Sequence, residues 1–217
     1  MFIGHFGIGL GAKKLKSEIS LGTLFFAAQF VDLLWPTLLL IGVERVEVMP
    51  GATAVTPLEF ISYPISHSLL FAVIWGSVIG GLYMAIRKNV RGAVLLGLLV
   101  LSHWVLDLIV HHPDLPITPG ESVKVGLGLW DSLAGTLAVE GVIFAVGTYV
   151  YARITRARDS VGHYGFWGLI VFLVLIHLSN LFGSPPPSAT AIAWVGQAQW
   201  LLVVWAYWID RHRSVAV

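Results

Sequence analysis

The sequence predicts an all-α fold, a polytopic transmembrane helical bundle of about six spans with a short apolar helix at its N-terminus. Of the 217 residues, 57% are hydrophobic and only 12% are charged, and the mean hydropathy is +0.82. A soluble domain carries roughly 25% charged residues, so this chain has too few to cover a water-exposed surface. The soluble, disordered and fibrous classes are therefore excluded, and we treat residues 1–217 as a single integral membrane domain.

Six stretches are apolar over the roughly 17–25 residues that a membrane-crossing helix needs. We expect spans near residues 19–43, 60–86, 92–111, 129–151, 164–183 and 190–209. Residues 1–12 are also apolar but too short to cross, which predicts a half-inserted or interfacial helix. The glycines of this segment would let it approach a neighbouring helix closely.

The cations indicate the topology. Eleven of the 13 Lys and Arg residues fall on one side of the expected spans, and only Arg45 and Lys124 fall on the other. Positive charge marks the cytoplasmic side, so we expect a multi-pass protein of the cell (inner) membrane with both termini in the cytoplasm. The net charge of +1 gives no sign of a nucleic-acid partner, and the lack of cysteine excludes disulfides, thiolate zinc sites and cysteine nucleophiles.

Ionisable side chains inside the expected spans are the candidate functional residues. Each costs about 2.5–3.5 kcal/mol on insertion scales, so such residues mark functional sites by default. Five of them are candidate metal ligands: His5, Asp32, His67, His103 and Asp107. Counting from the span ends places the last four in one layer, in the outer half of the membrane. His5 reaches only ~12 Å inward from the basic segment at residue 13, so a tilt or an extended N-terminus must close the gap to this layer.

The spacing in the third expected span favours metal binding. His103 and Asp107 are four residues apart and share one helical face. Imidazole nitrogen and carboxylate oxygen together suit a divalent metal, zinc foremost, with manganese or iron as alternatives. His111 continues this face, but eight residues rise ~12 Å, so one ion cannot bind both His103 and His111. His67, which precedes Ser68, could instead form a hydrogen bond to a neighbouring helix.

Three residues at the outer mouth, His111, His112 and Asp114, are candidate catalytic groups. They could carry protons to a leaving group, and a solvated polar cap is the alternative interpretation. Glu140 stands alone in the fourth expected span, where we expect its carboxyl group to bond between helices. His177 is expected to join helices or to support a ligand.

Four motifs carry a resemblance to a known family. In chain order they are Gly4-His5, Asp32, His67-Ser68 and Ser102-His103 followed by Asp107. This set resembles the bacterial and archaeal family of predicted inner-membrane metal-dependent hydrolases, which includes LexA-regulated members. The resemblance covers roughly residues 1–115 and implies a hydrolase that uses a divalent metal. The family typically has Asp-x-Asp where this chain has a single Asp32, and His-Arg before Thr-His-Ser where this chain reads Tyr-Pro-Ile-Ser-His-Ser.

These features support three hypotheses about function. The leading one is a membrane-embedded metal-dependent hydrolase that acts on a lipid-like ester, amide or phosphoester entering sideways from the bilayer. The alternative is a small transporter or permease with an intramembrane His/Asp ion or proton pathway, against which stand the short chain and the lack of a visible repeat. A third is a structural or sensory subunit whose histidines respond to pH.

Overall fold

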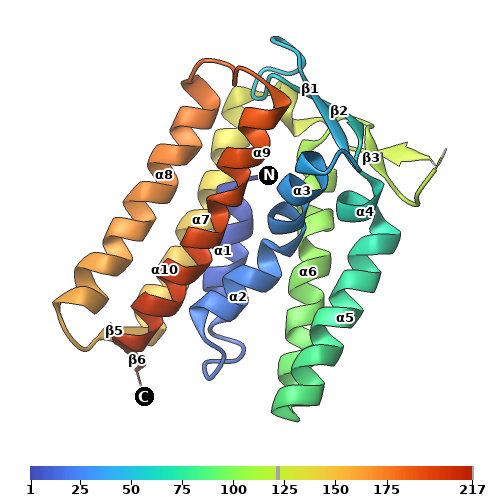
Figure 1. The fold of residues 1–217 in the computed structure, drawn as a ribbon. Coiled ribbons are helices and arrows are strands. Elements are labelled where there is room, and N and C mark those ends of the chain that lie inside the picture. The colour runs from blue at the N-terminus through green and yellow to red at the C-terminus, as the bar shows by residue number, and fades with distance from the viewer. Residues whose placement is uncertain (121–122, 217) are drawn as a thin grey trace.

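The computed structural model describes residues 1–120 and 123–216, and it confirms the all-α helical bundle (Figure 1). Within these described residues, five helices are long and apolar enough to cross a membrane, and a bent pair makes a sixth candidate span. The five are α5 (Leu69–Arg87), α6 (Val90–Val110), α7 (Leu133–Ile154), α8 with the π-helical turn η2 (Val161–Phe182), and α9–α10 (Ala189–Arg211). A multi-pass membrane protein is the architecture that these helices fit.

The bent pair consists of α2 (Leu21–Ala28) and α3 (Phe30–Leu40), whose axes differ by 57°. The break lies at Gln29, which leaves the helical region with φ −104° and ψ 3°. Breaking a helix releases carbonyl groups at the end of the first segment. The first expected span is therefore two helices at an angle, and Asp32 lies in the first turn of the second.

The second expected span begins later than predicted. Leu58–Ser62 form strand β2, which pairs antiparallel with β1 (Arg45–Val48), and Pro64–His67 form the single turn α4. Ser68 is extended and its side chain accepts a hydrogen bond from the Phe71 amide, so it caps a new helix, α5. His67 thus precedes the membrane-crossing helix instead of lying about seven residues inside it.

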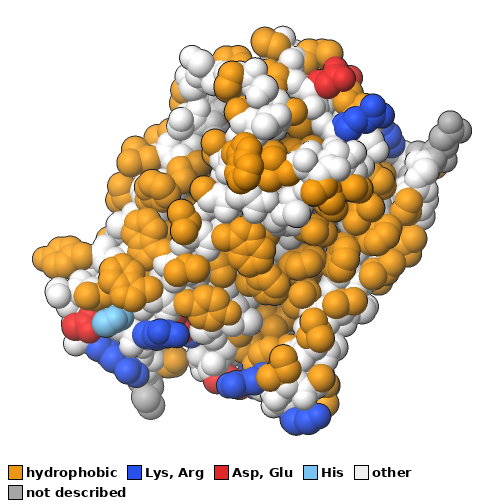
Figure 2. All heavy atoms as spheres, viewed as in Figure 1, with side chains coloured by type: hydrophobic (Ala, Val, Ile, Leu, Met, Phe, Trp, Pro, Cys, Tyr) orange, Lys and Arg blue, Asp and Glu red, His pale blue; other side chains and the backbone are white. Residues whose placement is uncertain are grey.

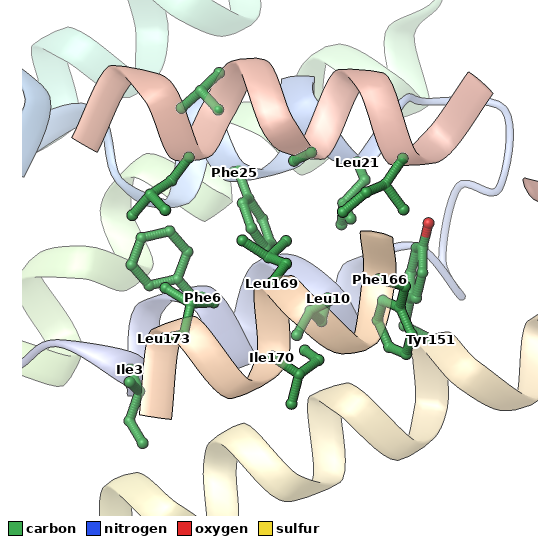
Figure 3. Packing of buried hydrophobic residues seen from close by; sticks show 14 of the residues in the cluster. Ile3, Phe6, Leu10, Leu21, Phe25, Tyr151, Phe166, Leu169, Ile170 and Leu173 are labelled. Atoms are coloured by element: carbon green, nitrogen blue, oxygen red, sulfur yellow. The ribbon is translucent and has the colours of Figure 1, made fainter. Parts of the chain in front are cut away.

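Helix α1 (Ile3–Ala12) lies in the interior of the bundle and is not interfacial (Figure 1). Its Gly7 packs directly on the α7 backbone. No larger residue would fit there, because a Cβ at this position would lie 2.7 Å from the Ile143 carbonyl oxygen. Gly147 of α7 makes the reciprocal contact with the Gly7 carbonyl. The expected close approach of these glycines to a neighbouring helix is therefore confirmed, and α1 stands at the centre of the apolar core (Figure 3).

The two ends of the bundle differ in their connections. We call one the hairpin end: it holds β1–β2, the pair β3 (Leu115–Pro116) and β4 (Lys124–Val125), and the turn η1 (Leu129–Asp131). The other, the basic end, holds the connections between α1 and α2 and between α5 and α6, together with β5 (Thr155–Ala157) paired to β6 (Arg213–Val215). Lys and Arg side chains gather there (Figure 2).

Candidate metal centre

Four side chains from three separate segments converge below the hairpin end. Asp32 comes from α3, His67 from α4, and His103 and Asp107 from successive turns of α6. Asp32 Oδ1 lies 3.4 Å from His67 Nε2 and 3.6 Å from His103 Nε2. Asp107 Oδ2 lies 3.3 Å from His103 Nε2 and 3.8 Å from His67 Nε2. All but Asp32 are almost fully buried.

These separations fit a single small cation. Nitrogen and oxygen ligands about 2.0–2.2 Å from a tetrahedral ion lie about 3.3–3.6 Å from one another. The four His–Asp separations in the cluster, 3.3 to 3.8 Å, are close to this range. His103 Nε2 is also buried with no hydrogen-bond partner in the described part of the chain. A nitrogen atom that coordinates a metal ion through its lone pair would have the same surroundings. The cluster can therefore hold a metal ion, and the groups Asp32–His67–His103 and His5–His103–Asp107 each bring three donor atoms within 4.8 Å.

The helix break fixes the tautomer of His103. His103 Nδ1 donates to the Ala28 carbonyl oxygen at 2.9 Å, and Ala28 is the last residue of α2 before the break. A ring whose Nδ1 carries the proton presents Nε2 as a lone pair. The irregularity in the first span thus provides both Asp32 and the acceptor that prepares His103 for metal binding.

A buried carboxylate prepares His67 in the same way. Glu44 accepts the Ser66 hydroxyl at 2.5 Å, and Ser66 Oγ lies 2.7 Å from His67 Nδ1. Because the hydroxyl proton points to Glu44, Ser66 accepts from His67 Nδ1, and Nε2 is left free. Sequence reasoning missed this chain of contacts: Ser66 is adjacent to His67, but Glu44 lies in a loop and carries no local signal.

His5 reaches the cluster from α1. Its Nε2 lies 3.1 Å from Asp107 Oδ1, and its ring stacks on His103 with centroids 3.6 Å apart. The nitrogen of Met1 lies 2.6 Å from the same Asp107 oxygen. Asp107 therefore has one oxygen engaged by α1 and the other directed at His103 and His67.

Glu140 of α7 holds the start of α1. Its Oε2 accepts the amide protons of Phe2 at 2.8 Å and Gly4 at 3.4 Å. Two otherwise unpaired amides of the first helical turn are satisfied in this way, and the expected bonding between helices is observed. The carboxylate thereby sets the depth of His5. The His177 ring of α8 stacks on Phe2, with centroids 6.3 Å apart.

Of the three candidate catalytic residues, His111 and Asp114 pair with each other, and His112 lies apart. His111 is buried, and its Nδ1 donates to Asp114 Oδ1 at 3.0 Å, while the Tyr63 hydroxyl donates to the same oxygen at 2.8 Å. Burial is the main reason that the pKa of Tyr63 is raised above its ordinary value of 10.0, so the phenol keeps its proton. His112 instead pairs with Asp131 at 2.9 Å on a half-exposed surface, and the structure does not bring it to the cluster.

A cavity of about 910 Å³ adjoins the cluster. Its walls include the ligand candidates Asp32, His67 and Asp107, the neighbouring Trp35 and His111, and then the facing sides of α8 and α9–α10. Pockets for small molecules usually measure about 300–1,000 Å³, so the volume suits a ligand well above the size of water. The cluster therefore lies at one end of a space large enough for a substrate.

Comparisons were made with family models, with curated proteins and with solved structures, and none of them matches the chain. The geometry of the cluster and its cavity is therefore the basis for assigning a function.

Proposed function

We propose that the protein is a membrane-embedded metal-dependent hydrolase, with zinc as the preferred ion and a lipid-like molecule as its substrate. One observation carries the proposal: a cluster of His and Asp donor atoms, with neighbouring His–Asp separations of 3.3 to 3.8 Å, adjoins a large cavity inside a membrane-spanning bundle, and Asp32, His67 and Asp107 line that cavity. Asp32, His67, His103 and Asp107 would hold the ion. Two carboxylates and two imidazoles match the charge and ligand preferences of zinc, and manganese or iron would also be accommodated.

The protein groups around this position have separate tasks. A divalent ion supplies Lewis acidity, which polarises the attacked bond and activates a water molecule. His111 is the group best placed to receive and return a proton, because its Nδ1 is held by Asp114 and its Nε2 is left as an acceptor. Tyr63 fixes Asp114 from the other side. His5 engages the second oxygen of Asp107 and keeps this carboxylate oriented.

Metal analysis of the purified protein tests the proposal. We expect about one zinc per chain in the wild type, a loss of this metal in His103→Ala, and a parallel loss of hydrolysis of a lipid ester. His163→Ala is the matched control, because His163 is exposed in η2 at the basic end. Protein that binds no stoichiometric transition metal, or that keeps its metal after His103→Ala, would contradict the proposal.

A transport function is the second candidate, and the broken α2–α3 span favours it, since discontinuous helices line many transporter sites. Against it, the space between the cluster and the basic end is filled by fully buried apolar side chains such as Phe6, Leu10 and Phe25 (Figure 3). Proteoliposome flux that depends on Asp107, in protein that binds no metal, would favour transport.

A further inference from the structure

We propose that the cavity between α8 and α9–α10 binds the acyl chain of a lipid substrate. In this lipid, an uncharged carboxylic ester or amide joins the acyl chain to the rest of the molecule. This inference rests on the proposed hydrolase function and narrows the substrate linkage from an ester, amide or phosphoester to a carboxylic ester or amide. The position of the cavity, its access from the bilayer, its charge and its unpaired polar atoms each support it.

The first argument is position. The α9–α10 wall runs from Ala191 to Trp205, about 21 Å at 1.5 Å per residue. The α8 wall runs from Phe172 to Leu181, about 14 Å on the same measure. One leaflet contributes about 15 Å of hydrocarbon to a bilayer. Both walls belong to candidate membrane spans, so the cavity has the length and the surroundings of one leaflet's acyl chain.

The second argument is access from the bilayer. Among the cavity residues, Phe172 is 43% exposed, Val195 is 73% exposed and Leu201 is 69% exposed. These side chains come from α8, α9 and α10; α8 lies at one edge of the bundle, and α10 runs beside it (Figure 1). At the far end, Phe172 and Trp205 meet with ring centroids 5.7 Å apart. A chain could therefore enter sideways between α8 and α9–α10 and would stop at this aromatic pair.

The third argument is charge. None of the described residues that line the cavity is Lys or Arg, whereas Asp32, Asp107 and Glu140 are acidic. A divalent ion at the cluster and the amino group of Met1, which lies 2.6 Å from Asp107, would together offset these three carboxylates. A phosphate group would therefore add a negative charge with no Lys or Arg side chain to pair with it, an arrangement that is costly away from water. An ester or amide linkage carries no charge and avoids that cost.

The fourth argument is the set of unpaired polar atoms. Four atoms of cavity residues are buried without a hydrogen-bond partner in the described chain: Trp35 Nε1, His177 Nε2, Gln199 Oε1 and Trp205 Nε1. All four belong to groups that are neutral or readily neutral, which suits carbonyl, amide or hydroxyl partners on a ligand. Trp35 is nearest to the cluster, with its ring 6.1 Å from that of His67. Its N–H is the donor that we assign to the substrate carbonyl oxygen.

The reaction is a simple hydrolysis. The oxygen of one water molecule forms a bond to the carbonyl carbon, and the bond from this carbon to the ester oxygen or amide nitrogen breaks. The bonding electrons leave with that oxygen or nitrogen, which receives a proton through His111. The products are a fatty acid and an alcohol or amine, and no oxidant or further reactant is required.

A chain-length comparison tests the acyl site. Ile176 of α8 lines the cavity, whereas Val171 of the same helix is 56% exposed and is not among the lining residues. We expect Ile176→Trp to slow hydrolysis of a sixteen-carbon acyl ester about tenfold or more by overfilling the cavity. Hydrolysis of a four-carbon ester should fall much less, the zinc content should stay the same, and Val171→Trp should behave as the wild type. Equal losses on both esters, or a wild type that cleaves a phosphodiester lipid faster than either ester, would overturn the inference.

A binding experiment separates this inference from the proposed function. Protein in nanodiscs is photolabelled with a phosphatidylcholine that carries a diazirine in its acyl chain, and the labelled peptides are mapped. We expect enrichment on α8 and α9–α10 over the lipid-facing side of α5, and we expect Ile176→Trp to remove this enrichment. Enriched labelling in protein that hydrolyses no ester would support the acyl site while contradicting the hydrolase. Equal labelling of all lipid-facing helices would overturn the acyl site, even in an active enzyme.

Discussion

The basic end and the hairpin end of the bundle treat buried polar groups in opposite ways. At the basic end, Lys13 pairs with Asp210 at 2.8 Å and also donates to the Ile19 carbonyl. Arg213 donates to Thr155 and Gly162 and lies over the Phe166 ring. Near the hairpin end, His103 Nε2, Trp35 Nε1 and His177 Nε2 are buried without hydrogen-bond partners in the described chain, although His103 Nε2 lies 3.3 Å from Asp107 and 3.6 Å from Asp32.

This difference indicates that the buried polar groups of the basic end stabilise the fold, whereas those near the hairpin end serve binding or catalysis. A buried polar atom without a partner costs about 1–3 kcal/mol, so a fold keeps such atoms only where something else is gained. The basic end satisfies its buried charges and closes over an apolar core. The hairpin end leaves buried donors and acceptors without hydrogen-bond partners, and two of them, on Trp35 and His177, belong to residues that line the cavity, as a binding site requires.

The largest expected effect is at the cluster itself. Asp107→Asn removes a carboxylate that faces both His67 and His103. If a binding free energy of about 10–16 kcal/mol is shared by four ligands, each contributes up to about 4 kcal/mol, or ~1,000-fold in affinity. Zinc competition with a chromogenic chelator measures this change. Asp131→Asn is the control, because Asp131 is exposed, and equal losses in both variants would remove the special role of Asp107.

A substitution at the basic end should lower the stability of the fold and leave the zinc affinity unchanged. Lys13→Met leaves the largely buried Asp210 carboxylate without its cation, which we expect to lower the free energy of unfolding by about 3 kcal/mol. Thermal unfolding in detergent measures the change, with exposed Lys14→Met as the control. Zinc affinity of the folded protein should stay the same. A matching fall in zinc affinity would show that the two ends are coupled and would break the comparison.

A smaller effect is expected from the contacts behind His67. Glu44→Gln preserves the side-chain shape but cannot accept the Ser66 hydroxyl through its nitrogen. We expect zinc affinity to fall about 10-fold, at the lower end of what groups supporting a metal ligand contribute. Glu47→Gln on exposed β1 is the control. Unchanged zinc affinity in Glu44→Gln would show that His67 is not prepared by this carboxylate.

The smallest effect concerns pH at the surface of the basic end. The hydrogen bond from His212, 2.7 Å long, lowers the pKa of Asp159 below its ordinary value of 3.8. A carboxylate with a lowered pKa stabilises the fold above its ordinary pKa, and this contribution is lost as the pH falls through the lowered value. Asp159→Asn should therefore melt slightly below the wild type at pH 6, and the difference should shrink as the pH falls below the ordinary pKa of 3.8. A difference that grows as the pH falls would contradict this assignment.

Much of the fold could be predicted because it depends on local composition. Apolar length and charge bias identify membrane spans without knowledge of their neighbours. Two predicted spans differ from the structure, each because of a single residue. Ser68 caps α5 and moves the start of the second span, and Gln29 lies at the break in the first span. The interior position of α1 depends on its contact with α7 through Gly7 and Gly147, which a linear pattern does not display.

The candidate site divides in the same way. The sequence by itself determined that a membrane protein carries His and Asp residues where ionisable groups are costly, since that cost is a property of each residue and its depth. Only the tertiary structure decided that His5 meets Asp107, that Glu44 and Ser66 stand behind His67, and that His112 turns away. It also created the cavity between α8 and α9–α10. These features depend on helix angles and on contacts between distant segments, and no local stretch of sequence encodes them.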